Sequence, residues 1–245
     1  VFFVIFEKIK LMKKRYTLLL LLVVHSLSAQ EINPKWMEGV APRNIGPGGM
    51  SGRVTTIDVV NSDSDVMYVG TASGGVWKST SGGVTWNPIF DNQVTASIGA
   101  IAIQQSNPDV LWVGTGEGNP RNSLTGGYGL YKSLDAGKTW KKFASLGRNW
   151  DFGSVDWADP EGKVIVAGKH ESNGEVYKSA DGGSSWTNVG LKASEHIGII
   201  AVHPKNSNIV WVAAYGPLWS SGGERGIYKT TDGGTTWRRV LNVSE

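Results

Sequence analysis

The chain has 245 residues, enough for one large all-β domain, and it contains 33 glycines, 11 tryptophans and no cysteine. Its formal net charge of +3 is carried by residues 1–29, because the remainder holds 19 basic and 20 acidic side chains. A near-neutral remainder offers no electrostatic surface to a nucleic acid, and a chain without cysteine forms no disulfide. We therefore expect no nucleic-acid partner and a core that is stable without covalent cross-links.

Residues 1–29 have the pattern of a secretory signal peptide. Met12–Arg15 is basic, Leu18–Val24 is apolar, and Ser26–Gln30 is a zone of mostly small residues suited to cleavage. We expect translation to start at Met12 and the protein to be secreted, periplasmic or displayed at the cell surface. The apolar run is shorter than the roughly 20 residues that span a bilayer, so no stable membrane span is expected in the mature chain; an uncleaved anchor is the alternative. Residues 30–50 are interpreted as an N-terminal lead-in.

Four similar units follow, at about 51–90, 96–144, 152–189 and 196–242. Each begins with two short apolar runs separated by a turn of Asn, Asp, Ser or Pro, which is typical of β-strands. The first runs are 54–59, 98–103, 152–157 and 197–202, and the second runs contain Tyr68, Trp112, Val166 and Trp211. Third strands are predicted at 75–79, 129–133, 175–179 and 226–230, and fourth strands end near residues 90, 144, 189 and 241.

An eight-residue motif of the form S/T-x-D-x-G-x-T-W separates the third and fourth strands of every unit. Its key residues are Ser79, Ser81 and Trp86, then Ser133, Asp135 and Trp140, then Ser179, Asp181 and Trp186, and finally Thr230, Asp232 and Trp237. The tryptophans recur every 46 to 54 residues, a period that indicates a repeat architecture. Four-stranded antiparallel units at this period predict an all-β propeller with four blades. A β-sandwich is the alternative, but it does not explain four copies of one hairpin.

The motif is expected to be structural. Its hydroxyl and carboxylate groups can accept hydrogen bonds from N–H groups of a tight turn, and the tryptophan can cover the hairpin. In the first copy Ser81 replaces the aspartate. A catalytic carboxylate would not tolerate that change, whereas a turn still finds an acceptor in the serine hydroxyl.

The motif resembles the Asp-box, or BNR repeat, of sialidase-like and sortilin-like propellers. The glycine-rich phrases at 46–53, 70–77 and 114–121 are similar to those of secreted bacterial sortilin-type propellers, which are often labelled glycosyl hydrolases. The resemblance covers the chain from about residue 40 onward. Because propellers of this group have more than four blades, it implies a truncated chain.

Meander topology places all four motifs at one end of the blades, so a ligand site is expected at the opposite end, where irregular loops collect. Candidate acids there are Glu117, Asp151, Glu195 and Glu224. Candidate ligand-binding residues are Arg53, Asn119, Arg121, Trp150, His170, Tyr215, Trp219 and Arg225.

Two signatures implied by the resemblance are missing. In xyloglucanase-type propeller hydrolases a catalytic aspartate follows a threonine and precedes Gly-Gly; here the matching position is Ala72. Sialidases need three arginines, for which Arg53, Arg121 and Arg225 are available, but Arg43–Gly46 is a poor match to their Phe/Tyr-Arg-Ile-Pro motif. No zinc-ligand spacing or phosphate-binding loop is present, so neither metal nor cofactor is expected.

The sequence therefore favours a secreted propeller that binds an extracellular peptide, protein or polysaccharide. A glycoside hydrolase acting through a pair of carboxylates at the loop end is the first alternative, since hydrolysis requires two such groups. A structural or cell-surface adhesion role is the second.

Overall fold

The computed structural model describes residues 33, 35, 53–118, 125–143, 151–157, 163–170 and 174–242. The chain divides into a unit of residues 1–44 and a unit of residues 45–245, and the propeller belongs to the second unit. The predicted signal peptide, and the lead-in apart from Asn33 and Lys35, lie outside the described residues. In the part that is described, no helix has the length and apolar character needed to cross a membrane.

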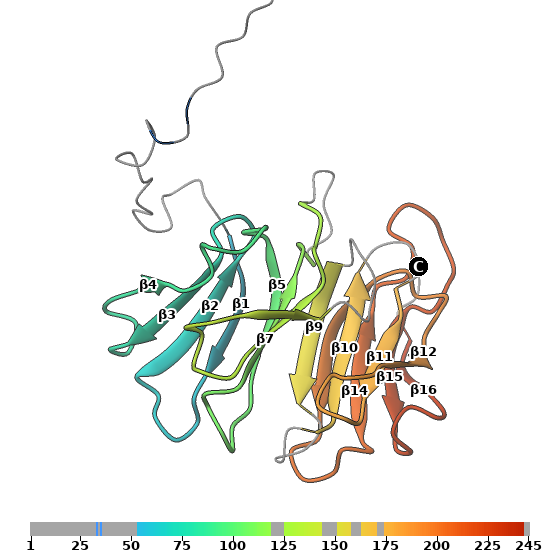
Figure 1. Ribbon diagram of the computed structural model, residues 1–245. Coiled ribbons are helices and arrows are strands. Elements are labelled where there is room, and N and C mark those ends of the chain that lie inside the picture. Colours follow the sequence, from blue (N-terminus) through green and yellow to red (C-terminus); the bar gives the residue numbers. More distant parts are fainter. Residues whose placement is uncertain are drawn as a thin grey trace, which may run out of the picture. The chain divides into compact units, whose positions relative to one another are not determined.

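The described residues form four antiparallel sheets of four strands each, which confirms the predicted all-β propeller (Figure 1). Each sheet has its strands in simple sequence order. The first two blades contain β1 (Val54–Val59), β2 (Val66–Thr71), β3 (Val76–Thr80) and β4 (Asn87–Pro88), then β5 (Ile98–Ile103), β6 (Leu111–Thr115), β7 (Leu130–Ser133) and β8 (Lys141–Phe143). The last two contain β9 (Asp151–Trp157), β10 (Ile165–His170), β11 (Val176–Ser179) and β12 (Thr187–Gly190), then β13 (Ile197–Val202), β14 (Val210–Ala214), β15 (Gly226–Thr230) and β16 (Arg238–Leu241). The strands lie in the segments that the apolar runs predicted.

The first strand of each blade contacts the first strand of the next, so β1, β5, β9 and β13 form the inner edge of the arc. Glycine permits this close approach at Gly99 in β5. A Cβ at that position would overlap the carbonyl oxygens of Phe152 and Gly116. The inner strands therefore meet backbone to backbone.

A separate apolar core fills each junction between neighbouring blades. Tyr68 and Phe90 of the first blade pack with Leu111 and Val113 of the second. Trp112, also in the second blade, faces the other way and packs with Phe152 of the third. Because adjacent residues of β6 point to opposite faces, one strand contributes to two cores. The third junction is built in the same way, from residues of the third and fourth blades.

Each Asp-box closes its own hairpin through a short hydrogen-bond network. In the second copy the hydroxyl of Ser133 accepts a bond from the Gly137 N–H at 2.9 Å, and Asp135 accepts from the N–H and the hydroxyl of Thr139 at 2.8 and 2.6 Å. The third and fourth copies repeat these bonds around Asp181 and Asp232. In the first copy the Ser81 hydroxyl accepts the corresponding N–H at 2.9 Å. The hydroxyl and carboxylate groups of the motif are thus engaged in hydrogen bonds within their own turns. We therefore assign them a structural role and not a catalytic one.

The Asp-box carboxylates give the fold a dependence on acid pH. Hydrogen bonds from the hydroxyl and N–H groups four residues on lower the pKa of Asp135, Asp181 and Asp232 to about 2, against about 3.9 in an unfolded chain. Because the folded-state pKa is the lower one, this stabilisation is present above about pH 4 and is lost as the pH falls towards 2.

We therefore expect the melting temperature of the wild type to fall between about pH 4 and pH 2 more steeply than that of a variant with all three aspartates changed to serine. Serine is the matched replacement, because Ser81 already serves the first copy. Calorimetry across this pH range measures the difference. Parallel curves for the two proteins would show that the carboxylates do not contribute.

Candidate functional site

The Asp-boxes and the turns between first and second strands lie at the same end of the blades. In each blade the N–H of the fourth Asp-box residue bonds to that turn: Gly82 to Asp65, Ala136 to Asp109, Gly182 to Lys163 and Gly233 to Asn208, at 2.9 to 3.1 Å. The opposite end, which we call the loop end, is formed by the connections from second to third strands and by the links between blades. The candidate ligand site was predicted from the sequence to lie at this loop end.

Arg53 and Glu117 form an ion pair at the loop end of the first two blades. The Glu117 side chain is only 3% exposed. Backbone bonds fix both residues, from the Ala72 N–H to the Arg53 carbonyl at 3.0 Å and from the Glu117 N–H to the Thr125 carbonyl at 3.3 Å. A buried carboxylate held by a guanidinium joins two blades and is poorly placed to exchange protons with a substrate. The sequence offered these two residues as separate candidates and did not predict their pairing.

Glu224 and Arg225 brace the long loop between β14 and β15. The Arg225 guanidinium donates to the carbonyls of Pro217 and Ser220 at 2.7 and 3.2 Å. Glu224 accepts from the Ala193 N–H at 2.9 Å through its carboxylate, and its own N–H donates to the Ala193 carbonyl at 3.1 Å. The Arg225 side chain thus cross-links the loop internally, and Glu224 ties the loop to the link between the third and fourth blades.

This braced loop displays two aromatic side chains. Trp219 is 81% exposed and Tyr215 is 37% exposed. The loop is also fixed at its base, where the Tyr215 N–H donates to the His196 carbonyl at 2.9 Å and His196 Nδ1 lies 3.0 Å from the Gly216 carbonyl oxygen. A large apolar side chain in water, carried on an anchored loop, is a ready contact surface for a ligand.

A cleft of about 380 Å³ runs along the inner strands. Its walls are short stretches of β1, β5, β9 and β13 together with Gly118 and Tyr215. Ile57 and Ile199 are 59% and 61% exposed there, between hydroxyl groups such as that of Ser154. Tyr215 stands against Gly198, where a Cβ would overlap its ring, and so borders the cleft. The cleft can therefore receive a ligand that presents both apolar faces and hydroxyl or amide groups.

Of the remaining candidates, the described contacts bring only Asp151 and His170 side by side. Asn119, Arg121 and Trp150 lie outside the described residues. Asp151 and His170 occupy the loop-end positions of β9 and β10 and are backbone partners in the ladder. Glu195 is half-buried with a φ of 60° in the link before β13. Within the described ranges, no three His, Asp or Glu side chains gather closely enough to hold a metal ion.

Sequence reasoning missed the cleft itself. It chose residues from loops, whereas most of the cleft lining comes from the inner strands. The sequence did contain a feature that could have indicated the cleft: Gly99 and Gly198 each follow an isoleucine at the same position of their strands. A glycine inside a strand often marks a close approach of backbone or ligand.

Four-stranded blades, each containing an Asp-box hairpin, define this chain as an Asp-box β-propeller. Residues 128–244 match the family Sortilin-Vps10, described as sortilin, neurotensin receptor 3. This match covers part of the chain, and it is similar to the kind of propeller that the Asp-box motif predicted.

Curated proteins are also similar to parts of the chain. The xyloglucanase Xgh74A of Acetivibrio thermocellus is 27% identical over 242 residues, covering 84% of this chain and 27% of that protein. A probable oligoxyloglucan-reducing end-specific xyloglucanase of Neosartorya fischeri is 34% identical over 119 residues, covering 46% of this chain and 13% of that protein. The chain thus spans about a quarter or less of the length of these curated relatives.

Solved structures give the same architecture. An ancestral GH74 enzyme has a TM-score of 0.65 at 22% identity, covering 82% of this chain and 25% of its own. YCF48 bound to D1 peptide has a TM-score of 0.50 at 12% identity, covering 79% of this chain and 55% of its own. At these identities the likeness shows the fold alone.

Proposed function

We propose that this chain is an exported glycan-binding propeller that holds a polysaccharide of the xyloglucan type without hydrolysing it. The observation that carries the proposal is Trp219, an almost fully exposed indole on a loop braced by Arg225 and Glu224. Exposed aromatic rings suit the apolar faces of sugar rings, and an anchored loop reduces the entropy that binding costs. Tyr215 of the same loop borders the cleft along the inner strands, so the cleft extends the proposed binding surface.

Two features support binding without hydrolysis. Position 72, where the resemblance to xyloglucanases calls for an aspartate, holds an alanine that is 7% exposed. Among the predicted acids, Glu117 is buried and ion-paired, and Glu224 accepts a backbone hydrogen bond. Neither is arranged as one of the two free carboxylates that glycoside hydrolysis uses. Export is proposed from the signal-peptide pattern of residues 1–29.

Changing Trp219 to alanine is expected to weaken xyloglucan binding by about tenfold or more, since a central exposed tryptophan commonly contributes over 1 kcal/mol to a contact. Calorimetry or affinity electrophoresis against xyloglucan and a panel of other polysaccharides measures the effect. The matched control is Val84→Ala, which shortens another highly exposed apolar side chain (83%), located at the Asp-box end. Wild-type protein should release no reducing sugar from any member of the panel.

Three results would contradict the proposal. If the Trp219 and Val84 variants bound xyloglucan with equal affinity, the loop between β14 and β15 would not be part of the binding surface. Release of reducing sugar that is abolished by Asp151→Asn would establish hydrolysis instead. Binding of an extended peptide in place of every polysaccharide would favour the peptide-binding alternative.

A further inference from the structure

The third strand of every blade carries a lysine, and the residue opposite it on the fourth strand differs between blades. The four lysines are Lys78, Lys132, Lys178 and Lys229, and their cross-strand partners are Asn87, Lys141, Thr187 and Arg238, in that order. The second and fourth blades thus place two cations directly opposite each other, whereas the first and third blades do not. Like charges in this arrangement destabilise a sheet, so the cations need an explanation.

The lysine on the third strand has a structural role. The Nζ atoms of Lys78, Lys132 and Lys178 donate to the carbonyls of Ala136, Gly182 and Gly233 in the Asp-box of the following blade, at 3.0 to 3.3 Å. Lys132 also lies over the Trp112 ring, 5.1 Å from its centroid. These contacts join neighbouring blades and account for a lysine at this position.

The cations on the fourth strand of the second blade have no such role. Lys141 and Lys142 are both exposed, and in the described part of the chain no carboxylate lies within ion-pair distance of either. Burial lowers the pKa of Lys132, and the positive charge of Lys141 lowers it further. In the first blade, by contrast, the uncharged Asn87 stands opposite Lys78. The second blade therefore retains a repulsion that an uncharged side chain at position 141 would avoid.

Protection of the outer strand does not explain the charges. A lysine on an outer strand can deter pairing with another sheet, yet the outer strand β12 begins with Thr187-Asn188 and contains neither charge nor proline. The pairs at the equivalent positions of β8 and β16 are Lys141-Lys142 and Arg238-Arg239, and all four of these side chains are exposed. Residues that break a local rule of stability are often functional.

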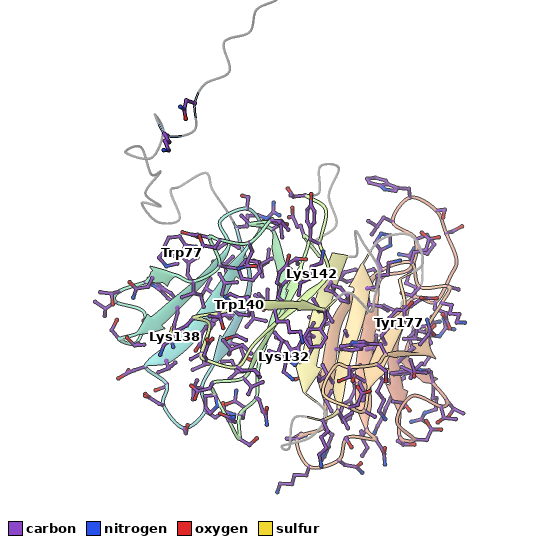
Figure 2. All side chains as sticks on the ribbon, in the orientation of Figure 1. Trp77, Lys132, Lys138, Trp140, Lys142 and Tyr177 are labelled. Atoms are coloured by element: carbon purple, nitrogen blue, oxygen red, sulfur yellow. The ribbon has the colours of Figure 1, made fainter. Side chains whose placement is uncertain are left out.

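We propose that an acidic polysaccharide, rich in uronate carboxylates, binds along the outer strands of the propeller through Lys141 and Lys142 of β8 and Arg238 and Arg239 of β16. Ammonium and guanidinium groups both donate charge-assisted hydrogen bonds to carboxylates. Lys142, labelled in Figure 2 together with Lys132, lies 5.7 Å from the centroid of the Tyr128 ring, and Tyr128 is 43% exposed. An aromatic ring beside a cation suits a sugar that has both an apolar face and a carboxylate.

This surface is separate from the one proposed around Trp219. The cleft lies along the inner strands, whereas β8 and β16 are the outer strands of their sheets. The second blade has the first and third blades on either side of it, and Lys141 and Lys142 are exposed with both neighbours in place. The two surfaces can therefore be tested independently.

Affinity electrophoresis of the whole chain in gels with and without polygalacturonate tests the proposal. The polysaccharide should retard the wild type, and the retardation should fall as salt is added, because salt screens exposed charges. The double variant Lys141→Gln/Lys142→Gln should bind about fivefold or more weakly, the loss expected for two exposed ion pairs, and Arg238→Gln/Arg239→Gln should act in the same direction. The matched control Lys192→Gln/Lys205→Gln removes the same charge from two other exposed lysines and should keep wild-type affinity.

Two further measurements separate binding from a structural role and from the function proposed above. Lys141→Gln should unfold at the wild-type temperature or slightly above it, because it removes the repulsion with Lys132; a clear loss of stability would instead give Lys141 a structural role. Trp219→Ala should bind polygalacturonate as the wild type does. A chain that binds polygalacturonate but no xyloglucan would contradict the proposed function and support this surface.

Three outcomes would overturn the proposal. The first is a wild type whose migration polygalacturonate does not change. The second is a control variant that loses as much affinity as the Lys141→Gln/Lys142→Gln variant. The third is polyglutamate binding at least as tightly as polygalacturonate, which would assign the surface to acidic polypeptides.

Discussion

The Trp112→Ala variant should lose about 3–5 kcal/mol of unfolding free energy, the range measured when a buried tryptophan or phenylalanine is truncated. Trp112 has no exposed surface, and its ring lies 4.9 Å from Phe143 and 6.0 Å from Trp186 between ring centroids. The indole occupies the junction between the second and third blades, and its removal leaves a cavity lined by Phe143 of the second blade and Trp186 of the third. Typical domain stabilities are about 5–15 kcal/mol, so this loss is a large share of the total.

Guanidinium unfolding monitored by circular dichroism measures this change. The matched control is Trp219→Ala, the same substitution at a site that is 81% exposed, which should alter stability by no more than about 0.5 kcal/mol. If the two variants unfolded at the same denaturant concentration, Trp112 would not be the packing unit that its burial indicates.

The Gly99→Ala variant should also be strongly destabilised, although the substitution adds a single methyl group. The new Cβ would overlap the carbonyl oxygens of Phe152 and Gly116, which are backbone atoms of two different segments and cannot rotate away. Overpacking a core costs about 1–3 kcal/mol and occasionally more. We expect a cost at the upper end of that range, together with a displaced β9 and a deformed cleft.

The control for this substitution is Gly126→Ala. A Cβ at position 126 meets no atom within 4 Å, so the same change there should be neutral. The difference between the guanidinium unfolding midpoints of the Gly99→Ala and Gly126→Ala proteins measures how much the steric overlap at position 99 lowers the stability. A Gly99→Ala protein as stable as the Gly126→Ala protein would mean that the inner strands separate easily, contrary to the contact described.

Much of the fold could be predicted from the sequence because its pattern occurs four times. The tryptophan of each Asp-box marked the end of one hairpin, and the glycine-containing runs marked the first strands, so the period alone indicated four-stranded blades. The lengths of the fourth strands were less predictable. The shortest, β4, covers only Asn87–Pro88, although the next residue, Ile89, still donates its N–H to the Val76 carbonyl of β3.

The candidate site was less predictable because its residues are brought together by tertiary contacts. Arg53 and Glu117 belong to different blades, and nothing in their local sequences indicates that they pair. Arg225 was chosen as a ligand-binding residue for its charge, but its partners are the carbonyls of Pro217 and Ser220, which every residue possesses. The role of Trp219 as an exposed candidate could be predicted, because a glycine-rich loop offers a tryptophan few neighbours to pack against.

Lys78, Lys132 and Lys178 of the first three blades each donate to a main-chain carbonyl in the Asp-box of the following blade. This contact has a consequence for how a propeller can gain or lose blades. Each contact involves a side chain of one repeat and a main-chain oxygen of the next, so it depends on the spacing of neighbours and on no distant part of the molecule. Stability in such arrays is approximately a sum of unit terms and nearest-neighbour terms. A gene duplication that adds one whole repeat would therefore supply its own lysine and its own acceptor. An array held together in this way can gain a blade without changing the contacts at its other junctions.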